Sequence, residues 1–249
     1  MERKVMERVY APGGITDGSI TLDRDEAHHL TRVRRVSAGA EIVAFDGLGN
    51  SWLCRLTEST KTGAWLDVIE KLQEDTVMPG PEIWLGTAVP KGDRFDWIVE
   101  KATELGVDRL VPLVCERSVV EPRPTKLDRL RRTVIEACKQ SGRDRLMEIA
   151  DPVPLKAFLA GLPADSIGLF ADRGPAALPG LASKKSDMAY VLACVGPEGG
   201  WTVPERAMAA GLGWHSVGLG PHILRIETAA IAMAACVRQC FAASSGSAG

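Results

Sequence analysis

YVLACVGPEGG, residues 190–200, joins an apolar run to a glycine-rich loop and decides the fold of the second half of the chain. The run 190–195 has the length and the β-branched content of a buried strand. In the loop 196–200, three glycines and a proline surround one carboxylate, Glu198. Glycine lets a backbone approach a ligand closely, so that bare N–H and C=O groups can read a planar base. The commoner meaning of such a loop is a plain turn.

A second strand pattern with a glycine loop follows further along the chain. Residues 214–219 form a short strand pattern that leads into GPHILRIETA, residues 220–229. The alanine-rich segment from there to about Phe241 predicts a helix. Two strands thus end in glycine-containing loops, where open α/β sheets usually bind ligands. Neither loop has GxGxxG spacing and the chain contains no GxxxxGK[ST], which disfavours a dinucleotide or P-loop phosphate site.

Composition is that of an ordinary globular protein, with 249 residues, 45% hydrophobic and 25% charged, and a net charge of −2. Because the chain is no polycation, nucleic-acid binding would need a local basic patch. Its six cysteines form no CxxC pair and no Cys/His cluster, so we expect neither structural zinc nor any other metal site, and no disulfide scaffold. The sequence has no signal-peptide core and no membrane-spanning run, which predicts a cytoplasmic protein without a membrane partner.

Residues 1–75 consist mainly of short strand patterns. The runs 42–45 and 52–56 flank the turn 46–50, DGLGN, and predict a hairpin, and another strand is expected at 64–69. Helical spacing marks residues 25–36, where Ala27, Leu30 and Val33 recur on one face. Several strands with one helix predict a small β-barrel.

The predicted helix carries a concentration of basic side chains, including His29, Arg32 and Arg35. Such a run is usually a solvated charged face. The functional alternative is a phosphate-contacting patch, because guanidinium groups grip phosphate with paired donors. Charge alone leaves both meanings open.

Residues 76–82, with Pro-Gly-Pro inside them, are a plausible linker to a region of alternating strands and helices. Strands are predicted at 83–89, 110–114 and 167–171, and helices at 93–105, with Asp93 as N-cap and Gly106 as the residue after the helix, and at 125–141. This alternation predicts a mostly parallel sheet covered on both faces. The small polar tail 244–249 is expected to be disordered.

GPEGG and LGPHILRIETA together resemble the SPOUT superfamily of S-adenosylmethionine-dependent RNA methyltransferases, and within it the branch that makes N3-methyluridine in bacterial 16S ribosomal RNA. HHLTRVRRVSAG followed by FDGLGN resembles that family's N-terminal PUA-like RNA-binding domain, and KGD with EKATELGV resembles the first helix of its catalytic domain. The resemblance covers nearly the whole chain. It implies an α/β SPOUT domain with a trefoil knot over 83–243, a PUA-like β-barrel over 1–75, and a homodimer whose active sites form at the subunit interface.

The resemblance also implies the site residues. S-adenosylmethionine would bind in a bent form between the two glycine loops, against Gly196, Pro197, Glu198, Gly199, Gly200, Leu219, Gly220, Ile223, Leu224 and Thr228. RNA contacts are expected from Arg8, His29, Arg32, Arg35, Arg117 and Arg143. The sequence departs from the family pattern at Met147, where proline is usual, and at Ile226, where threonine is usual. The second departure weakens any argument that a hydroxyl at position 226 is chemically needed.

The expected reaction sets the catalytic candidates. Uracil N3 bears a hydrogen at neutral pH, so its attack on the methyl group needs that proton removed or the developing anion stabilised. Arg225 is the first candidate for stabilising the uracil oxygens or a nearby phosphate. Glu198 is a candidate base, although a carboxylate between glycines can instead hold loop amides, and Glu227 is a candidate base or a feature of the helix start.

Three functions therefore stay open. The first is N3-methylation of a specific uridine in the 16S ribosomal RNA of the small subunit. The second is the same chemistry on another RNA, such as a transfer RNA. The third is a catalytically inactive ribosome-associated RNA-binding protein, against which the intact GPEGG and ILRIETA segments argue.

Overall fold

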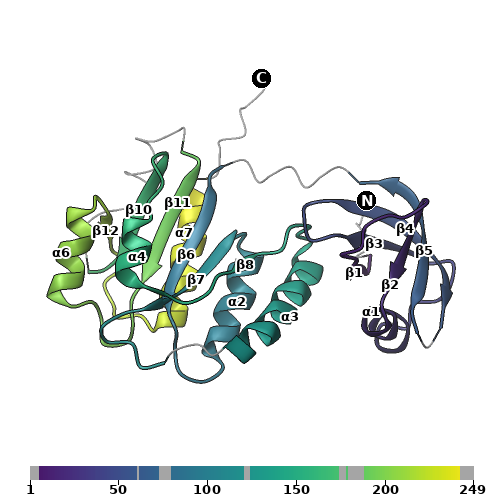
Figure 1. Ribbon diagram of the computed structural model, residues 1–249, viewed down its shortest axis with the longest axis horizontal. Coiled ribbons are helices and arrows are strands. Elements are labelled where there is room, and N and C mark those ends of the chain that lie inside the picture. Colours follow the sequence, from purple (N-terminus) through teal and green to yellow (C-terminus); the bar gives the residue numbers. More distant parts are fainter. Residues whose placement is uncertain are drawn as a thin grey trace. The chain divides into compact units, whose positions relative to one another are not determined.

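The computed structural model describes residues 6–60, 62–72, 80–120, 124–173, 178 and 188–241 (Figure 1). The predicted tail 244–249 and residues 76–79 of the predicted linker lie outside the described residues. Contacts divide the chain into two compact units, Met1–Val77 with Ile135–Leu146, and Met78–Val134 with Met147–Gly249. The chain therefore passes from the first unit to the second after residue 77, returns within helix α3 (Pro124–Ser141), and enters the second unit again after Leu146. The domain ranges 1–75 and 83–243 stay a prediction.

The first unit is built on a five-stranded sheet with the order β1-β3-β4-β5-β2. β1 pairs with β3 in parallel and the other pairs are antiparallel. The hairpin is confirmed: Phe45 pairs with Ser51, and between them the Asp46 carboxylate accepts the amide of Leu48 at 2.7 Å. The strands are β1 (Arg8–Tyr10), β2 (Ser19–Leu22), β3 (Glu41–Phe45), β4 (Ser51–Ser59) and β5 (Ala64–Lys71).

The predicted helix 25–36 forms as α1 (Arg24–His28) followed by a π-helical turn, η1 (His29–Val33). Asp23 caps it by accepting the amide of Glu26 at 2.9 Å. Ala27 and Leu30 are buried as predicted, but Val33 is exposed. The wider π turn rotates each following residue off the 3.6-residue face, which explains why Val33 leaves the core.

Residues 135–146 join the first unit through buried polar contacts. The ammonium of Lys139 pairs with Glu26 of α1, and its side chain is only 8% exposed. Asp144 accepts the Ser51 hydroxyl at 2.8 Å and also pairs with Arg8. A carboxylate and an ammonium taken out of water need such partners, so these contacts fix the end of α3 to the sheet.

The second unit contains seven strands in the order β12-β10-β11-β6-β7-β8, with β9 also paired to β7, and every pair is parallel. This confirms the predicted parallel sheet. The strands are β6 (Glu82–Ala88), β7 (Arg109–Val114), β8 (Glu148–Ile149), β9 (Val153–Pro154), β10 (Ser166–Ala171), β11 (Tyr190–Val195) and β12 (His215–Val217).

Helices pack along this sheet (Figure 1). α7 (Ile226–Phe241) lies against β6, β11 and α2 (Arg94–Glu104), whereas α4 (Leu155–Ala160) lies against β7, β9 and α6 (Val203–Gly211). Asp93 precedes α2 as predicted, but its side chain makes no capping hydrogen bond. Gly106 follows the helix with φ +77°, the left-handed conformation that glycine adopts without strain. In the described part of the chain, no helix is both long and apolar enough to cross a bilayer.

Candidate functional site

The carboxyl ends of the parallel strands meet at one edge of the sheet, and the two glycine loops lie there. One loop follows β11 and the other follows β12. These strands are not neighbours, because β10 pairs with both of them and lies between them. The loop after β7, residues 115–118, reaches the same edge. A site at this edge is therefore built from loops that the sheet brings together across intervening strands.

Trp201 supports the first loop, residues 196–200. Its side chain is 3% exposed and stacks on Phe170 with ring centroids 4.4 Å apart, and its indole N–H donates to the carbonyl of Ala171 at 2.7 Å. A Cβ atom on Gly196 would lie 2.8 Å from the indole ring. The loop turns at Gly200, whose φ is +67° and whose amide donates to the carbonyl of Pro197 at 2.8 Å. Glycine is thus required at 196 by packing and at 200 by backbone conformation.

Arg117 contacts the first loop, and its predicted role in RNA binding stays a prediction. Its guanidinium donates to the carbonyl of Gly199 at 2.7 Å, and a Cβ on Gly199 would lie 3.2 Å from the Arg117 Cβ. Glu198 is exposed and makes no hydrogen bond or ion pair with another described residue. The alternative in which Glu198 holds loop amides therefore has no contact to support it.

Glu205 is the carboxylate that holds loop amides, and sequence reasoning missed it. Its side chain is buried in the first turn of α6, where it forms a capping box with Thr202. One carboxylate oxygen accepts the amide of Glu116 at 3.0 Å, and the other accepts the amide of Thr202 at 2.7 Å. Burial, with the nearby charge of Glu205, raises the pKa of the Cys115 thiol to about 12, so this cysteine is no nucleophile at neutral pH. The signal for Glu205 was the T-x-x-E spacing of residues 202–205.

The second loop, residues 218–225, is more open than the first. Gly220 has φ +126°, a Cβ atom added to it would meet nothing within 4 Å, and the Ile223 side chain is 78% exposed. Leu219 and Leu224 are half-buried, and Arg225 is exposed. Among described residues, no side chain from Leu219 to Arg225 makes a hydrogen bond or ion pair. The loop therefore presents apolar groups, bare backbone and one unpaired guanidinium.

Glu227 lies in the first turn of α7 and is 5% exposed. One of its oxygens is 3.7 Å from a guanidinium nitrogen of Arg94, at the start of α2, and the other is buried without a hydrogen-bond partner among the described residues. An acid in the first turn of a helix is favoured by the helix dipole. Thr228, beside it, is exposed. The structure thus joins Glu227 to Arg94, a residue that sequence reasoning did not select.

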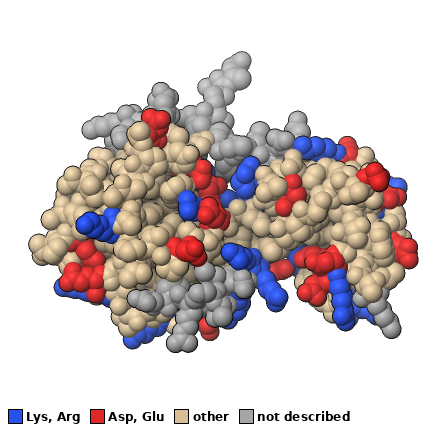
Figure 2. Space-filling model, in the orientation of Figure 1, with Lys and Arg blue, Asp and Glu red and all other residues tan. Residues whose placement is uncertain are grey.

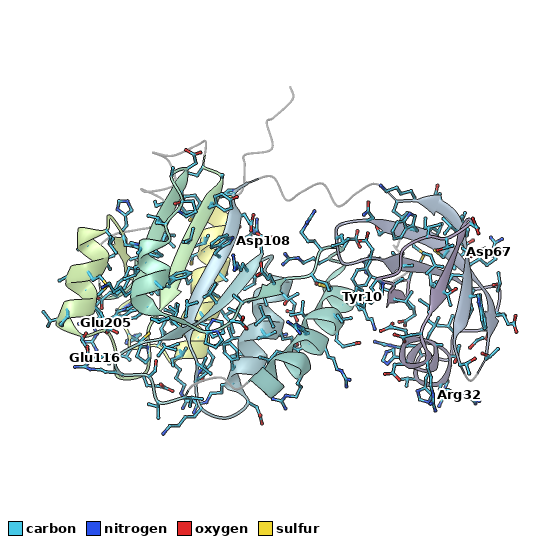
Figure 3. The ribbon with its side chains drawn as sticks, in the orientation of Figure 1. Tyr10, Arg32, Asp67, Asp108, Glu116 and Glu205 are labelled. Carbon is cyan, nitrogen blue, oxygen red and sulfur yellow. The ribbon has the colours of Figure 1, made fainter. Side chains whose placement is uncertain are left out.

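The predicted RNA contacts of the first unit differ in their surroundings. Arg32 and Arg35 are exposed and His29 is half-buried, and Figure 3 shows Arg32 at the helical end of this unit. Arg8 instead pairs with buried Asp144, and its guanidinium lies 5.1 Å from the centre of the Phe45 ring. Arg8 also donates to the carbonyl of Arg143, which is half-buried. These contacts favour a structural role for Arg8, and an RNA contact there stays a prediction.

Charge is mixed on the surface shown in Figure 2, where acidic and basic side chains alternate over the described residues. Among those residues, no group of three or more His, Cys, Asp or Glu side chains is arranged to hold a metal ion. The carboxyl edge of the parallel sheet combines two glycine loops with exposed charged side chains, among them Arg117, Glu198 and Arg225.

Comparisons with known proteins identify the chain as an RNA methyltransferase. Residues 78–238 match the family described as RNA methyltransferase domain, and residues 22–69 match the RNA methyltransferase PUA domain. A ribosomal RNA small subunit methyltransferase E of Synechocystis sp. is 35% identical over 89% of this chain and 73% of its own length. Its Bacillus subtilis counterpart is 29% identical over 85% of this chain and 86% of its own length.

Solved structures agree with these relatives. The ribosomal RNA small subunit methyltransferase E of Neisseria gonorrhoeae, bound to S-adenosyl methionine, superposes with a TM-score of 0.85 at 31% identity, covering 95% of this chain and 98% of its own. A Legionella pneumophila structure in complex with the same cofactor gives a TM-score of 0.83 at 27% identity, covering 94% and 97%. The chain belongs to the ribosomal RNA small subunit methyltransferase E family. The predicted fold class, a SPOUT methyltransferase domain with an N-terminal PUA domain, is thereby confirmed.

Proposed function

We propose that this protein transfers the methyl group of S-adenosylmethionine to N3 of a specific uridine in the 16S ribosomal RNA of the small subunit. The observation that carries the proposal is the pair of glycine loops at one sheet edge, in a chain that matches a cofactor-bound relative over 95% of its length. An RNA substrate of this kind also agrees with the predicted cytoplasmic location. The same chemistry on a transfer RNA is the alternative.

The residues of the two loops fit the cofactor. The open backbone at Gly220 and the amides around Gly196 suit the edge of an adenine ring, which hydrogen-bonds to N–H and C=O groups. Ile223, exposed at 78%, and half-buried Leu219 and Leu224 offer apolar surface to the faces of the ring. The predicted cofactor contacts of both loops thus have suitable chemistry, with the side chain of Glu198 exposed to solvent.

The bound cofactor supplies a methyl group already activated by its sulfonium, so the chain's own residues have to align the uridine and handle one proton. Arg225 is exposed and unpaired among described residues, so its guanidinium is free to stabilise negative charge on the uracil oxygens as the N3 proton leaves. Of the two candidate bases, Glu198 is exposed and unpaired among those residues, whereas Glu227 is buried beside Arg94. We therefore assign proton removal to Glu198 and a positioning role to Glu227.

RNA binding is proposed for the N-terminal unit, where exposed Arg32 and Arg35 and half-buried His29 are available to phosphates. N3 lies on the pairing edge of uracil, so the target base has to leave its stack before it reacts.

A homodimer is proposed on the outward face of α7. Ile231, Ala232, Ala235 and Cys236 are partly or fully exposed on this helix, although all four are small or apolar. Residues 229–237 of α7 carry only small or apolar side chains. A helical segment that is apolar all round is normally buried on every side, and a second copy of the chain would cover this face. Sedimentation equilibrium tests it: a dimer is expected, and Ala235→Glu should yield monomers. A monomeric wild-type protein would exclude the proposal.

Two experiments test the function itself. Calorimetry with S-adenosylmethionine should show binding, and an absence of heat would leave a binding protein for RNA only. Nucleoside analysis of ribosomal RNA from a deletion strain should show that N3-methyluridine is lost from 16S RNA. Unchanged N3-methyluridine there, with a loss of a modified uridine from transfer RNA, would favour the alternative substrate.

A further inference from the structure

Glu205 joins three segments of the second unit with one buried carboxylate. It lies in α6, and its two oxygens accept the amides of Glu116, at 3.0 Å, and of Thr202, at 2.7 Å. The Thr202 hydroxyl also donates to it at 3.1 Å. Figure 3 shows Glu205 and Glu116 close together at the same end of this unit. The loop after β7, the end of the first glycine loop and the start of α6 are thus held by a single side chain.

A helix cap explains only the two contacts with Thr202. The capping box uses the oxygen that faces Thr202, and it satisfies amides at the helix start. The amide of Glu116 belongs to another segment, 89 residues away in sequence. Its neighbour Arg117 donates to the carbonyl of Gly199 at 2.7 Å, so the loop after β7 and the first glycine loop are joined at a second point. The Glu205–Glu116 and Arg117–Gly199 contacts both hold the glycine loop against the loop after β7.

We infer that Glu205 is the positioning residue of the cofactor site: it sets the conformation of the Gly196–Gly200 loop by anchoring it to the loop after β7. This inference rests on the proposed function. Trp201 fixes the start of the glycine loop beneath Gly196, and Glu205 fixes its end at Thr202. A carboxylate is required because both amides donate, and only a group with two acceptor oxygens satisfies them together.

The test is Glu205→Gln in the full-length protein, with S-adenosylmethionine as the probe. The amide keeps the size of the side chain but turns one acceptor into a donor that faces an amide N–H. We expect the dissociation constant of S-adenosylmethionine to rise about tenfold, the cost of one lost charged hydrogen bond, with the KM for the cofactor rising in parallel and kcat changing less than the KM. The matched control is Asp23→Ala, which removes the cap of α1 in the other unit and should lower thermal stability with unchanged cofactor affinity.

Arg117→Met supplies a second variant, whose exposed side chain makes misfolding no concern. It should weaken cofactor binding about threefold by releasing Gly199, and its effect should be less than multiplicative with that of Glu205→Gln, because either change frees the same loop. Wild-type cofactor affinity in the Glu205→Gln protein, or fully multiplicative effects in the double variant, would overturn the inference and leave the proposed function standing. A wild-type protein that binds no S-adenosylmethionine would overturn both.

Discussion

The two glycine loops are built in opposite ways. Residues 196–200 are fixed from below by Trp201, from the side by Arg117 and at their end through Glu205. In the second loop, residues 218–225, the side chains from Leu219 to Arg225 make no hydrogen bond or ion pair with any described residue. Under the proposed function, this difference predicts that the first loop is a preformed surface for the cofactor and that the second adjusts to cofactor and RNA. Preformed parts lower the entropy that binding costs, and open parts let a large substrate enter.

Removing the guanidinium of the open loop should have the largest effect. Arg225→Ala is expected to lower kcat about 100- to 1000-fold, the usual loss when one group that stabilises transition-state charge is deleted. Cofactor affinity should stay within about twofold, because the proposed role of Arg225 is toward the uracil. Single-turnover methylation and calorimetry measure the two quantities. Lys156→Ala, which removes an exposed positive charge on α4, is the control. Comparable methylation by Arg225→Ala would remove Arg225 from its role.

A methyl group added to the first glycine loop should have the second-largest effect. In Gly196→Ala the new Cβ would lie 2.8 Å from the Trp201 ring, which is itself packed on Phe170 and cannot retreat. Overpacking of this kind costs about 1–3 kcal/mol. We expect the first loop to be displaced and the cofactor to bind about 10- to 100-fold more weakly. Gly211→Ala at the end of α6 is the control, since a Cβ there meets nothing within 4 Å. Equal affinities in the two alanine variants would mean that the first loop is not preformed.

The exposed apolar group of the open loop offers a smaller effect. Ile223→Ser should leave thermal stability unchanged, because the side chain is 78% exposed in the free protein. If Ile223 covers the cofactor, the variant loses about 1 kcal/mol of apolar contact and binds about fivefold more weakly. Val203→Ser, at a residue 77% exposed on α6, is the comparison and should bind normally. A Tm that falls in Ile223→Ser would show that the second loop is packed rather than open.

The sequence predicts the local parts of this site well. Strand 190–195 and its glycine loop form as the apolar run and the glycines indicate, and the helix expected up to about Phe241 is α7. Local patterns decide these elements, because strand burial and turn chemistry are set by near neighbours in sequence. The short helices α4 and α6 were missed. α6 carries its capping signal in residues 202–205, but α4 has only six residues and no capping hydrogen bond.

The long-range contacts and the strand order could not be predicted from the sequence. No periodicity relates Glu205 to the amide of Glu116, and nothing local places β10 between β11 and β12. Residues 135–146 are joined to the N-terminal unit by the buried pairs Lys139–Glu26 and Asp144–Arg8. No local sequence pattern relates the members of these pairs. The trefoil knot stays a prediction of the same kind, because it is a property of chain topology and is implied by the resemblance alone.

The smallest expected effect is a pH-dependent change in stability at Asp172, which lies beside the first loop. Burial raises the pKa of Asp172, but hydrogen bonds from the Arg206 side chain and the Arg173 backbone outweigh it, so that the pKa is lowered overall. Arg206 donates to Asp172 at 2.6 Å and also to the carbonyl of Trp201, which ties this pair to the first loop. A lowered pKa stabilises the folded state above the unfolded value of about 3.9, and this contribution is lost as the pH falls through the folded value.

Asp172→Asn should therefore lower stability at pH 7 by less than about 1 kcal/mol, since Arg206 is partly exposed, which corresponds to a Tm lower by about 2–4 °C at most. As the pH falls through the lowered pKa of Asp172, the wild type loses the same charge, so the two melting temperatures should converge. Asp151→Asn, at an exposed aspartate on the loop before α4, should match the wild type at every pH. A difference in Tm that persists in acid would mean that Asp172 acts through its shape and not its charge. The fixed loop would then depend on packing by Trp201 and on Glu205, with no contribution from the Asp172 ion pair.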